Sequence, residues 1–359
     1  MRILAIESSC DETACAIVED GVKILSNVVA SSKELYHKYG GIMPELAARE
    51  QLSSILPVIN EALNVLPQEK NAMQTIAAHI DSIAVTVGPG LIGSLLVGVE
   101  TARTMAMLTG IPIIPVNHVL AHMYANFVIH EPSTTNQKSI AFPVISLVVS
   151  GGHTELYLMK SSKKLTWLGG TLDDAAGECF DKTARLLGFG NEGGVAIAKA
   201  AKWHHKSNKL SVIKLPRPML DTNNEFNFSF SGLKSAIVRL VTTLKETTTD
   251  NMLTPDIIAH IAYETQEAIT DVLVKKTLMA AEKYNAKSIL LSGGVAANTK
   301  LREKFIASIK KFNVSITFHA PPPALCTDNA VYIASCAFFL GNPVHWKDIV
   351  AAPDLTVEI

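Results

Sequence analysis

The fold is decided near the start of the chain, in the stretch RILAIESSCDETACAIVEDGVKILSNVVA at residues 2–30. Alternating apolar and β-branched residues separated by short polar turns predict strand, turn, strand, turn, strand. Residues 143–168, PVISLVVSGGHTELYLMKSSKKLTWL, repeat this plan, with the polar turn at Ser150–Thr154. Each unit is followed by helical sequence and then by a strand that runs into glycines, DSIAVTVGPGLIGSLL at 81–96 and KSILLSGGVAANTKLREKF at 287–305. The chain therefore has the pattern of a tandem duplication.

A duplicated strand meander followed by helices is the plan of the actin, Hsp70 and sugar-kinase (ASKHA, RNase H-like) superfamily. We therefore expect an α/β fold with two actin-like domains around a central cleft. Chance similarity of two hairpins is the alternative. The expected domains are residues 1–117 and 118–327, with a C-terminal helix at 328–359 that packs back on the first domain.

The composition limits the classes of function. At 359 residues the chain is long enough for two cores, and 18% charged against 48% hydrophobic residues argues against disorder. A net charge of -1 gives no global attraction to nucleic acid or membranes, so such a partner needs a local patch. Five scattered cysteines without C-x-x-C spacing indicate reduced thiols in a cytoplasmic protein. The uncharged residues 82–99 are divided by Gly88-Pro89-Gly90, which predicts a strand and a helix and no membrane span.

A pair of histidines suggests a metal site. VNHVLAHMYA, residues 116–125, places His118 and His122 four apart, on one face of a helix. Asp328 in PPPALCTDNAVYIA is either a helix N-terminal acid or a third ligand. Two histidines and a carboxylate suit zinc or ferrous iron. A metalloprotease would need H-E-x-x-H, but Val119 occupies the position of the glutamate. That class is disfavoured.

Four further segments carry candidate binding or catalytic residues, and each has an ordinary structural alternative. An acidic pair lies in the first hairpin turn, where it either faces solvent or positions a nucleophile. Glycine-rich turns allow phosphates to approach backbone N–H groups, but plain hairpins contain glycine too. An asparagine at a helix start either caps the helix or binds a nucleotide. The candidates are Asp11, Glu12, Val148, Val149, Ser150, Gly151, Gly152, Asp181, Gly194 and Asn298.

Together these segments resemble the TsaD family of tRNA threonylcarbamoyltransferases, once labelled glycoproteases. The resemblance covers nearly the whole chain through ten segments in order: IESSCDETACAIV, YGGIMPELAARE, GPGLIGSLLVG, NHVLAH, LVVSGGHTEL, DDAAGECFDKTARLLG, PRPM, FSFSGLKSA, SGGVAANTKLR and CTDNAVYIA. It implies transfer of a threonylcarbamoyl group from threonylcarbamoyl-adenylate to the exocyclic amine of the adenosine 3′ of a tRNA anticodon, with release of AMP.

The resemblance also implies roles for the candidate residues. His118, His122 and Asp328 would bind one divalent metal per subunit, Fe2+ in the first place and Zn2+ as the alternative. Residues 148–152 would line the adenylate or threonylcarbamoyl pocket, and Asp181, Gly194 and Asn298 would hold the adenosine. Asp11 and Glu12 match the acidic pair implicated in catalysis. The expected partners are tRNA and the bacterial-type TsaB and TsaE helper proteins, and no membrane.

Some positions depart from the family pattern. Gln51 stands where a histidine is usual, and Glu192, Val195 and Ala198 alter the pattern around the second glycine pair. An ATPase or kinase of the same fold and a catalytically idle scaffold remain as alternative functions. Residues 198–218 form the densest basic segment and are a candidate for contact with tRNA phosphates, with Trp203 available for stacking on a base.

Overall fold

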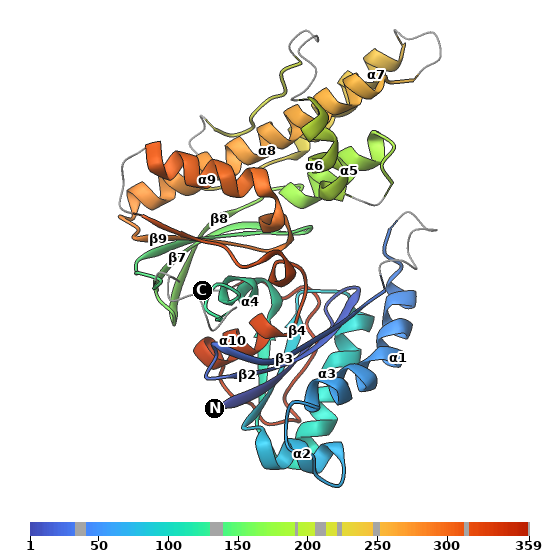
Figure 1. Ribbon diagram of the computed structural model, residues 1–359, viewed down its shortest axis with the longest axis vertical. Coiled ribbons are helices and arrows are strands. Elements are labelled where there is room, and N and C mark those ends of the chain that lie inside the picture. Colours follow the sequence, from blue (N-terminus) through green and yellow to red (C-terminus); the bar gives the residue numbers. More distant parts are fainter. Residues whose placement is uncertain are drawn as a thin grey trace. The chain divides into compact units, whose positions relative to one another are not determined.

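The computed structural model describes residues 1–32, 41–129, 139–190, 193–204, 213–220, 225–246, 252–311 and 316–357 (Figure 1). They divide into two compact units. Unit 1 comprises Met1–Ser139, Ser162–Lys164 and Pro321–Ile359, and unit 2 comprises Ile140–Ser161 and Leu165–Ala320.

Unit 1 contains a five-stranded sheet in the order β3-β2-β1-β4-β5. Its strands are β1 (Arg2–Glu7), β2 (Glu12–Glu19), β3 (Lys23–Ser31), β4 (Ser82–Gly88) and β5 (Ile113–Asn117). β1 and β2 pair antiparallel, as do β2 and β3, whereas β1, β4 and β5 run parallel. β1 and β4 are buried over almost their whole length, as their nearly continuous apolar sequences predict.

Helices cover this sheet. They are α1 (Pro44–Leu63), α2 (Ala72–His79), α3 (Ile92–Thr109), α4 (His118–Tyr124) and α10 (Val331–Leu340), the last after a short 3-10 turn η3 (Pro323–Leu325). α1, α2 and α3 enclose an apolar core with alternate residues of β1 and β4, such as Leu4, Ile6, Ile83 and Val85. α10 packs on β1, β2, β4 and β5 and against α4.

Unit 2 repeats the topology of unit 1. Its sheet order, β10-β9-β6-β7-β8, becomes that of unit 1 when it is read from the other end. The strands are β6 (Val144–Val149), β7 (Thr154–Ser161), β8 (Lys164–Gly170), β9 (Ser288–Ser292) and β10 (Thr317–His319). β6 pairs antiparallel with β7 and parallel with β9, as β1 does with β2 and β4. The predicted duplication is confirmed.

The helices of unit 2 are α5 (Ala176–Leu186), α6 (Gly193–His204), α7 (Ser231–Glu246), α8 (Pro255–Lys283) and α9 (Thr299–Lys311), with a 3-10 turn η2 (Gly294–Ala297) after β9. α8 packs on β6 and contacts α5, α6 and α9. Asp173 supports the start of α7, because its carboxylate accepts hydrogen bonds from the backbone N–H groups of Phe230 and Ser231.

The structure contains the elements predicted around Gly88-Pro89-Gly90, but its C-terminal helix is shorter than predicted. The strand and helix on either side of Gly88-Pro89-Gly90 are present as β4 and α3. Among the described residues, no helix combines the length and the apolar composition needed to cross a bilayer. The C-terminal helix expected over 328–359 is limited to α10, because Gly341 and Pro343 follow it and a proline cannot continue a helical hydrogen-bond pattern. The domain boundary near residue 117 stays a prediction, and the compact units divide between Ser139 and Ile140.

Candidate metal centre and glycine turns

The first two candidate ligands are presented by α4, directly after β5. Asn117 caps this helix, because its side-chain oxygen accepts hydrogen bonds from the backbone N–H groups of Val119 and Leu120 at 2.9 and 3.1 Å. One helical turn separates His118 from His122, and their ring centroids are 4.7 Å apart. Both imidazoles are buried. The local sequence therefore fixes the two rings beside each other.

Asp328 completes the group from the loop between η3 and α10. Its Oδ1 lies 3.7 Å from Nε2 of His118 and 3.8 Å from Nε2 of His122. The adjacent Asn329 holds this loop, since its side chain donates to the carbonyl of Thr327 and accepts from the N–H of Val331. Tyr332 donates a hydrogen bond to the same Oδ1 at 3.3 Å. All of these residues belong to unit 1.

The spacing of these atoms suits a shared ion. Two ligand atoms at about 2.1 Å from a tetrahedral zinc lie about 3.4 Å apart. The observed 3.7 and 3.8 Å are close to that value and too long for hydrogen bonds. The three ligand atoms all lie within 4.8 Å of one another. His118, His122 and Asp328 therefore form a group that can hold one metal ion.

Glu7 lies behind His118, at the end of β1. Its Oε2 accepts a hydrogen bond from Nδ1 of His118 at 3.0 Å and one from the hydroxyl of Thr86 at 2.6 Å. Its Oε1 accepts from the N–H of Ser9 at 2.6 Å. Burial opposes ionisation, but His118 and these hydrogen bonds outweigh it and lower the pKa of Glu7. Burial also disfavours the imidazolium, yet the carboxylates of Glu7 and Asp328 raise the pKa of His118 to about 9.

The side chain of Gln51, on α1, is hydrogen-bonded to the turn that carries Asp11 and Glu12. The side-chain amide of Gln51 donates to the carbonyls of Cys10 and Glu12, each at 3.1 Å, and lies 3.4 Å from that of Ser8. Gln51, which stands where the family usually has a histidine, therefore supports the turn of Asp11 and Glu12. Burial, followed by the charges of Asp11 and Asp328, raises the pKa of the Cys10 thiol, so this cysteine is protonated.

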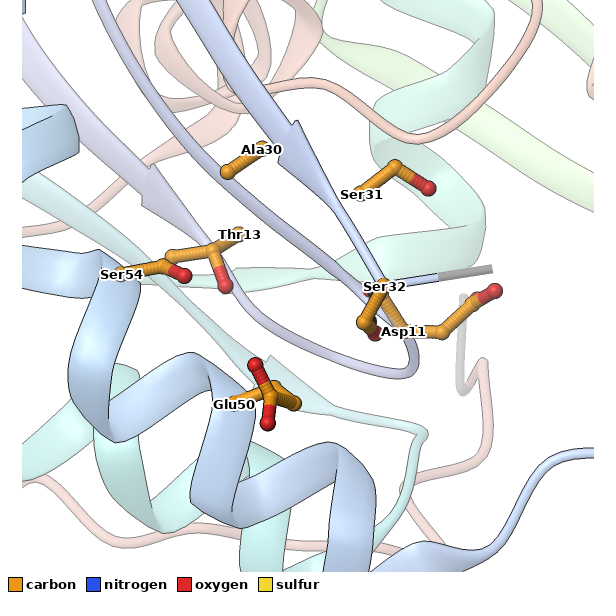
Figure 2. A pocket seen from close by; sticks show the side chains of 7 residues that line it. All are labelled: Asp11, Thr13, Ala30, Ser31, Ser32, Glu50 and Ser54. Atoms are coloured by element: carbon orange, nitrogen blue, oxygen red, sulfur yellow. Dashed lines mark hydrogen bonds between the residues drawn. The ribbon is translucent and has the colours of Figure 1, made fainter. Parts of the chain in front are cut away.

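A small polar cavity lies beside this turn, between β2, β3 and α1 (Figure 2). Figure 2 shows the side chains of Thr13 and Glu50 reaching toward one another, whereas the carboxylate of Asp11 points away from them. The lining residues are Asp11, Thr13, Ala30, Ser31, Ser32, Glu50 and Ser54.

In unit 2, the glycine turns meet at the ends of β6 and β9. Gly293 has a φ of +87°, and a Cβ at this residue would lie 2.4 Å from the carbonyl oxygen of Val149. A Cβ at Gly177, in the first turn of α5, would lie 2.3 Å from the carbonyl oxygen of Ser150. Val148 and Val149 are buried in β6, and Gly151 and Gly152 are exposed in the following turn. Glycine is thus needed where backbone segments approach each other closely.

Asp181 and Gly194 are also brought together. Asp181 on α5 accepts a hydrogen bond from the N–H of Gly194, and partial burial raises the pKa of its carboxyl. Asn298 performs the capping role that was the ordinary alternative. Its Oδ1 accepts from the N–H of Leu301 at 3.1 Å, and its Nδ2 donates to Gln266 at 3.1 Å.

The supporting residues Glu7, Thr86, Asn329 and Tyr332 were missed as functional candidates in the sequence. A signal existed for Glu7, which is an acid inside the apolar run RILAIES and therefore needs a buried partner. The other three carry no comparable signal. Within the basic segment 198–218, residues 205–212 lie outside the described residues.

Comparison with known proteins decides the family. A family profile, TsaD, described as tRNA N6-adenosine threonylcarbamoyltransferase, matches residues 23–335. The chain belongs to the TsaD family. A relative from Symbiobacterium thermophilum with that same description is 44% identical over 359 residues, which cover 99% of this chain and 97% of the relative. One from Dehalococcoides mccartyi is 45% identical over 359 residues, with 99% of each chain covered.

Solved structures support the fold of this TsaD family member. The crystal structure of T. kodakarensis HypF matches 94% of the chain and 47% of the HypF chain, with a TM-score of 0.56 and 16% identity. Full-length HypF in a phosphate- and nucleotide-bound form has a TM-score of 0.52 and 11% identity, over 94% of this chain and 46% of that one. At these identities the likeness shows the fold alone. The predicted α/β fold of two duplicated actin-like halves is confirmed.

Proposed function

We propose that this chain transfers the threonylcarbamoyl group of threonylcarbamoyl-adenylate to N6 of the adenosine 3′ of the anticodon, in tRNAs that read codons starting with A. In this reaction the bond between the carbamoyl carbon and the phosphate oxygen breaks, a bond from that carbon to N6 forms, N6 loses a proton and AMP leaves. The observation that carries the proposal is the near full-length similarity to relatives with this activity in their description. The close grouping of His118, His122 and Asp328 supports it.

The proposed metal is Fe2+, with Zn2+ as the alternative, at one ion per subunit. The donor set fits, because both metals accept imidazole nitrogens and a carboxylate oxygen. Glu7 and Asp328 also offset the two positive charges of such an ion. When it is bound, the metal would supply a Lewis acid that polarises a carbamoyl or phosphate oxygen. The protein's own part is to hold Oδ1 of Asp328 at a distance from each imidazole that needs little adjustment.

Asp11 and Glu12 are assigned to the acceptor amine. A carboxylate can accept a hydrogen bond from N6 and take the proton that N6 loses on acylation. The network of Gln51 carbonyl contacts restricts the turn that presents them. Both acids are buried, with 6% and 5% of their surfaces exposed, which limits competition from water. This arrangement supports a role in positioning the acceptor or in removing its proton.

The glycine turns of unit 2 are assigned to the adenylate. The exposed Gly151 and Gly152 place no side chain over their backbone N–H groups, so a phosphate or carbonyl can approach them. Together with Val148, Val149 and Ser150 they would line the adenylate or threonylcarbamoyl pocket. Asp181, Gly194 and Asn298 would hold the adenosine. For Asn298 this role would have to be compatible with its cap on α9, which uses the side-chain oxygen.

Docking of the proposed TsaB and TsaE helpers is supported by an apolar surface on unit 1. α1 exposes Leu52 and Leu56, with 68% and 63% of their surfaces accessible, and α3 exposes Ile92 and Leu96. Each pair is four apart, so each lies on one face of its helix, and α1 contacts α3. For tRNA, α6 presents the exposed Lys202 and Trp203, at the start of the basic segment.

The proposal is tested by incubating the iron-loaded protein with threonylcarbamoyl-adenylate and unmodified tRNA, with and without the helpers. Threonylcarbamoyladenosine is then measured by mass spectrometry of the digested tRNA. Product is expected with the parent and with His345→Ala, a control at an exposed histidine. It should be absent with His118→Ala. A chain that forms no product in any combination but hydrolyses ATP or phosphorylates a small acceptor would support the kinase alternative instead.

A further inference from the structure

We infer that Glu7 is a positioning residue for the metal centre, which it acts on through His118. The inference rests on the metal assignment proposed above and adds a residue outside the three ligands. Glu7 is fully buried at the end of β1. Its carboxylate is 3.0 Å from Nδ1 of His118, on the side of the ring opposite to Nε2, which faces Asp328.

The contact with Glu7 determines which nitrogen of His118 carries the proton. An ionised carboxylate can only accept hydrogen bonds, so Nδ1 must carry the proton in this contact. The other ring nitrogen, Nε2, faces Asp328, so it is the nitrogen whose proton a metal would displace on binding. The hydroxyl of Ser9 lies 3.3 Å from the same Nδ1, a longer distance than that to Glu7. The stronger partner thus selects the tautomer that can bind a metal through Nε2.

The carboxylate of Glu7 is itself held in place by hydrogen bonds. Oε2 also accepts from Thr86 of β4 at 2.6 Å, and Oε1 accepts from the backbone N–H of Ser9 at 2.6 Å. Three hydrogen bonds from three segments therefore fix the carboxylate. Because Glu7 cannot turn, the plane and direction of the His118 ring are set before any ion arrives. Such outer carboxylates tune metal affinity by about 10- to 100-fold in other metal centres.

Glu7→Gln tests this arrangement because the amide keeps the shape but has only one acceptor oxygen. With the oxygen toward Ser9, the NH2 group faces Nδ1 of His118 and favours the wrong tautomer. With the oxygen toward His118, the NH2 group opposes the N–H of Ser9. In either orientation the site is disturbed. Glu19→Gln is the matched control, since Glu19 is a carboxylate of the same sheet whose partners are Arg2 and Lys23.

The experiment measures Zn2+ and Co2+ affinity by chelator competition, and the visible absorption of the Co2+ form, for the parent and both variants. We expect Glu7→Gln to bind about 10- to 100-fold more weakly with an altered Co2+ spectrum, and Glu19→Gln to match the parent. A folded Glu7→Gln protein with the parent's affinity and spectrum would overturn the inference alone. A parent that binds no metal would overturn the metal assignment and the inference with it.

A second measurement does not depend on the variant folding. In the zinc-loaded parent labelled with 15N at histidine, NMR should show the proton of His118 on Nδ1 and none on Nε2. A proton on Nε2 of His118 would contradict the inference whatever the fate of Glu7→Gln.

Discussion

Replacing Gln51 with methionine should loosen the acidic turn and lower the rate of transfer. The side chain keeps its length but loses the amide that donates to the carbonyls of Cys10 and Glu12 at 3.1 Å. Each such hydrogen bond contributes about 1 kcal/mol, and the contact with Ser8 at 3.4 Å is too long to count fully. Removal of the buried Oε1 of Gln51, which accepts no hydrogen bond from any residue that the structure describes, offsets part of this loss. The net local cost is about 1–2 kcal/mol, so opening of the turn should become about 5- to 30-fold more frequent.

Hydrogen exchange measured by mass spectrometry on peptides covering residues 8–14 reports this opening directly. Exchange there should accelerate by the same factor, and the yield of threonylcarbamoyladenosine should fall, because the turn carries Asp11 and Glu12. Gln68→Met is the control, since the Gln68 amide donates to the carbonyls of Leu63 and Leu66 at the end of α1, away from the turn. Unchanged exchange over residues 8–14 in Gln51→Met would refute the reasoning.

Three further predictions concern the metal, the helper surface and the pH dependence of stability. Asp328→Asn should weaken metal binding by more than the factor of about 10 to 100 that is expected when a residue behind a ligand, such as Glu7, is replaced. Metal analysis showing full occupancy would contradict the role of Asp328 as a ligand. Combined Leu52→Glu and Leu56→Glu should weaken helper binding at least about 100-fold, since each of these exposed leucines would contribute about 1.5 kcal/mol once the helper buries it. Calorimetry with Val350→Glu as an exposed control measures this, and equal affinities would place the interface elsewhere. Desolvation tends to raise the pKa of the exposed Asp173, but the hydrogen bonds that it accepts from two serine hydroxyls and two backbone N–H groups lower it. Its stabilisation is therefore present above about pH 4 and lost as the pH falls through the folded-state pKa. Asp173→Asn should cost about 1 kcal/mol at pH 7 and progressively less below pH 4, and a pH-independent difference in thermal unfolding would count against this.

The regular elements could be predicted from the sequence because each has a strong local signal. The hairpins of residues 2–30 and 143–168 alternate in the strand period and have polar turns, and the structure forms them as β1–β3 and β6–β8. The strand and helix around Gly88-Pro89-Gly90 follow from the glycines and the proline. The extent of the C-terminal helix was wrong, since the Gly341 and Pro343 signals after α10 were passed over.

The candidate site was only partly accessible to sequence reasoning. His118 and His122 share a helix, so their proximity follows from spacing alone. For Asp328 the residues left two alternatives, a helix N-terminal acid or a third ligand, and only the resemblance to a family decided between them, since no local rule brings residue 328 to residue 118. Glu7 was not among the predicted candidates, although a buried acid in an apolar run needs a partner. Gln51 was noted only as a departure from the family pattern, whereas its amide holds the turn of Asp11 and Glu12.

The topology explains why residues so distant in sequence meet at one place. β1, β4 and β5 run parallel, so their carboxyl ends lie at the same edge of the sheet. Glu7 is the last residue of β1, Thr86 lies two residues before the end of β4, and His118 directly follows β5. Ligand sites of open α/β sheets occur at this edge.

Unit 2 obeys the same rule with different residues. β6 and β9 run parallel, and Ser150 and Gly293 directly follow them. The duplicated topology therefore provides an equivalent edge in each unit, and the sequence at that edge determines its chemistry. In unit 1 the edge is occupied by carboxylates and imidazoles, which suit a cation. In unit 2 it carries glycines, of which Gly151 and Gly152 are exposed, and an exposed glycine turn suits an anion. A divalent metal is a cation and an adenylate is an anion, so the two edges suit the two proposed ligands. Duplication of the fold, followed by divergence of these few strand-end residues, therefore accounts for both halves of the proposed chemistry.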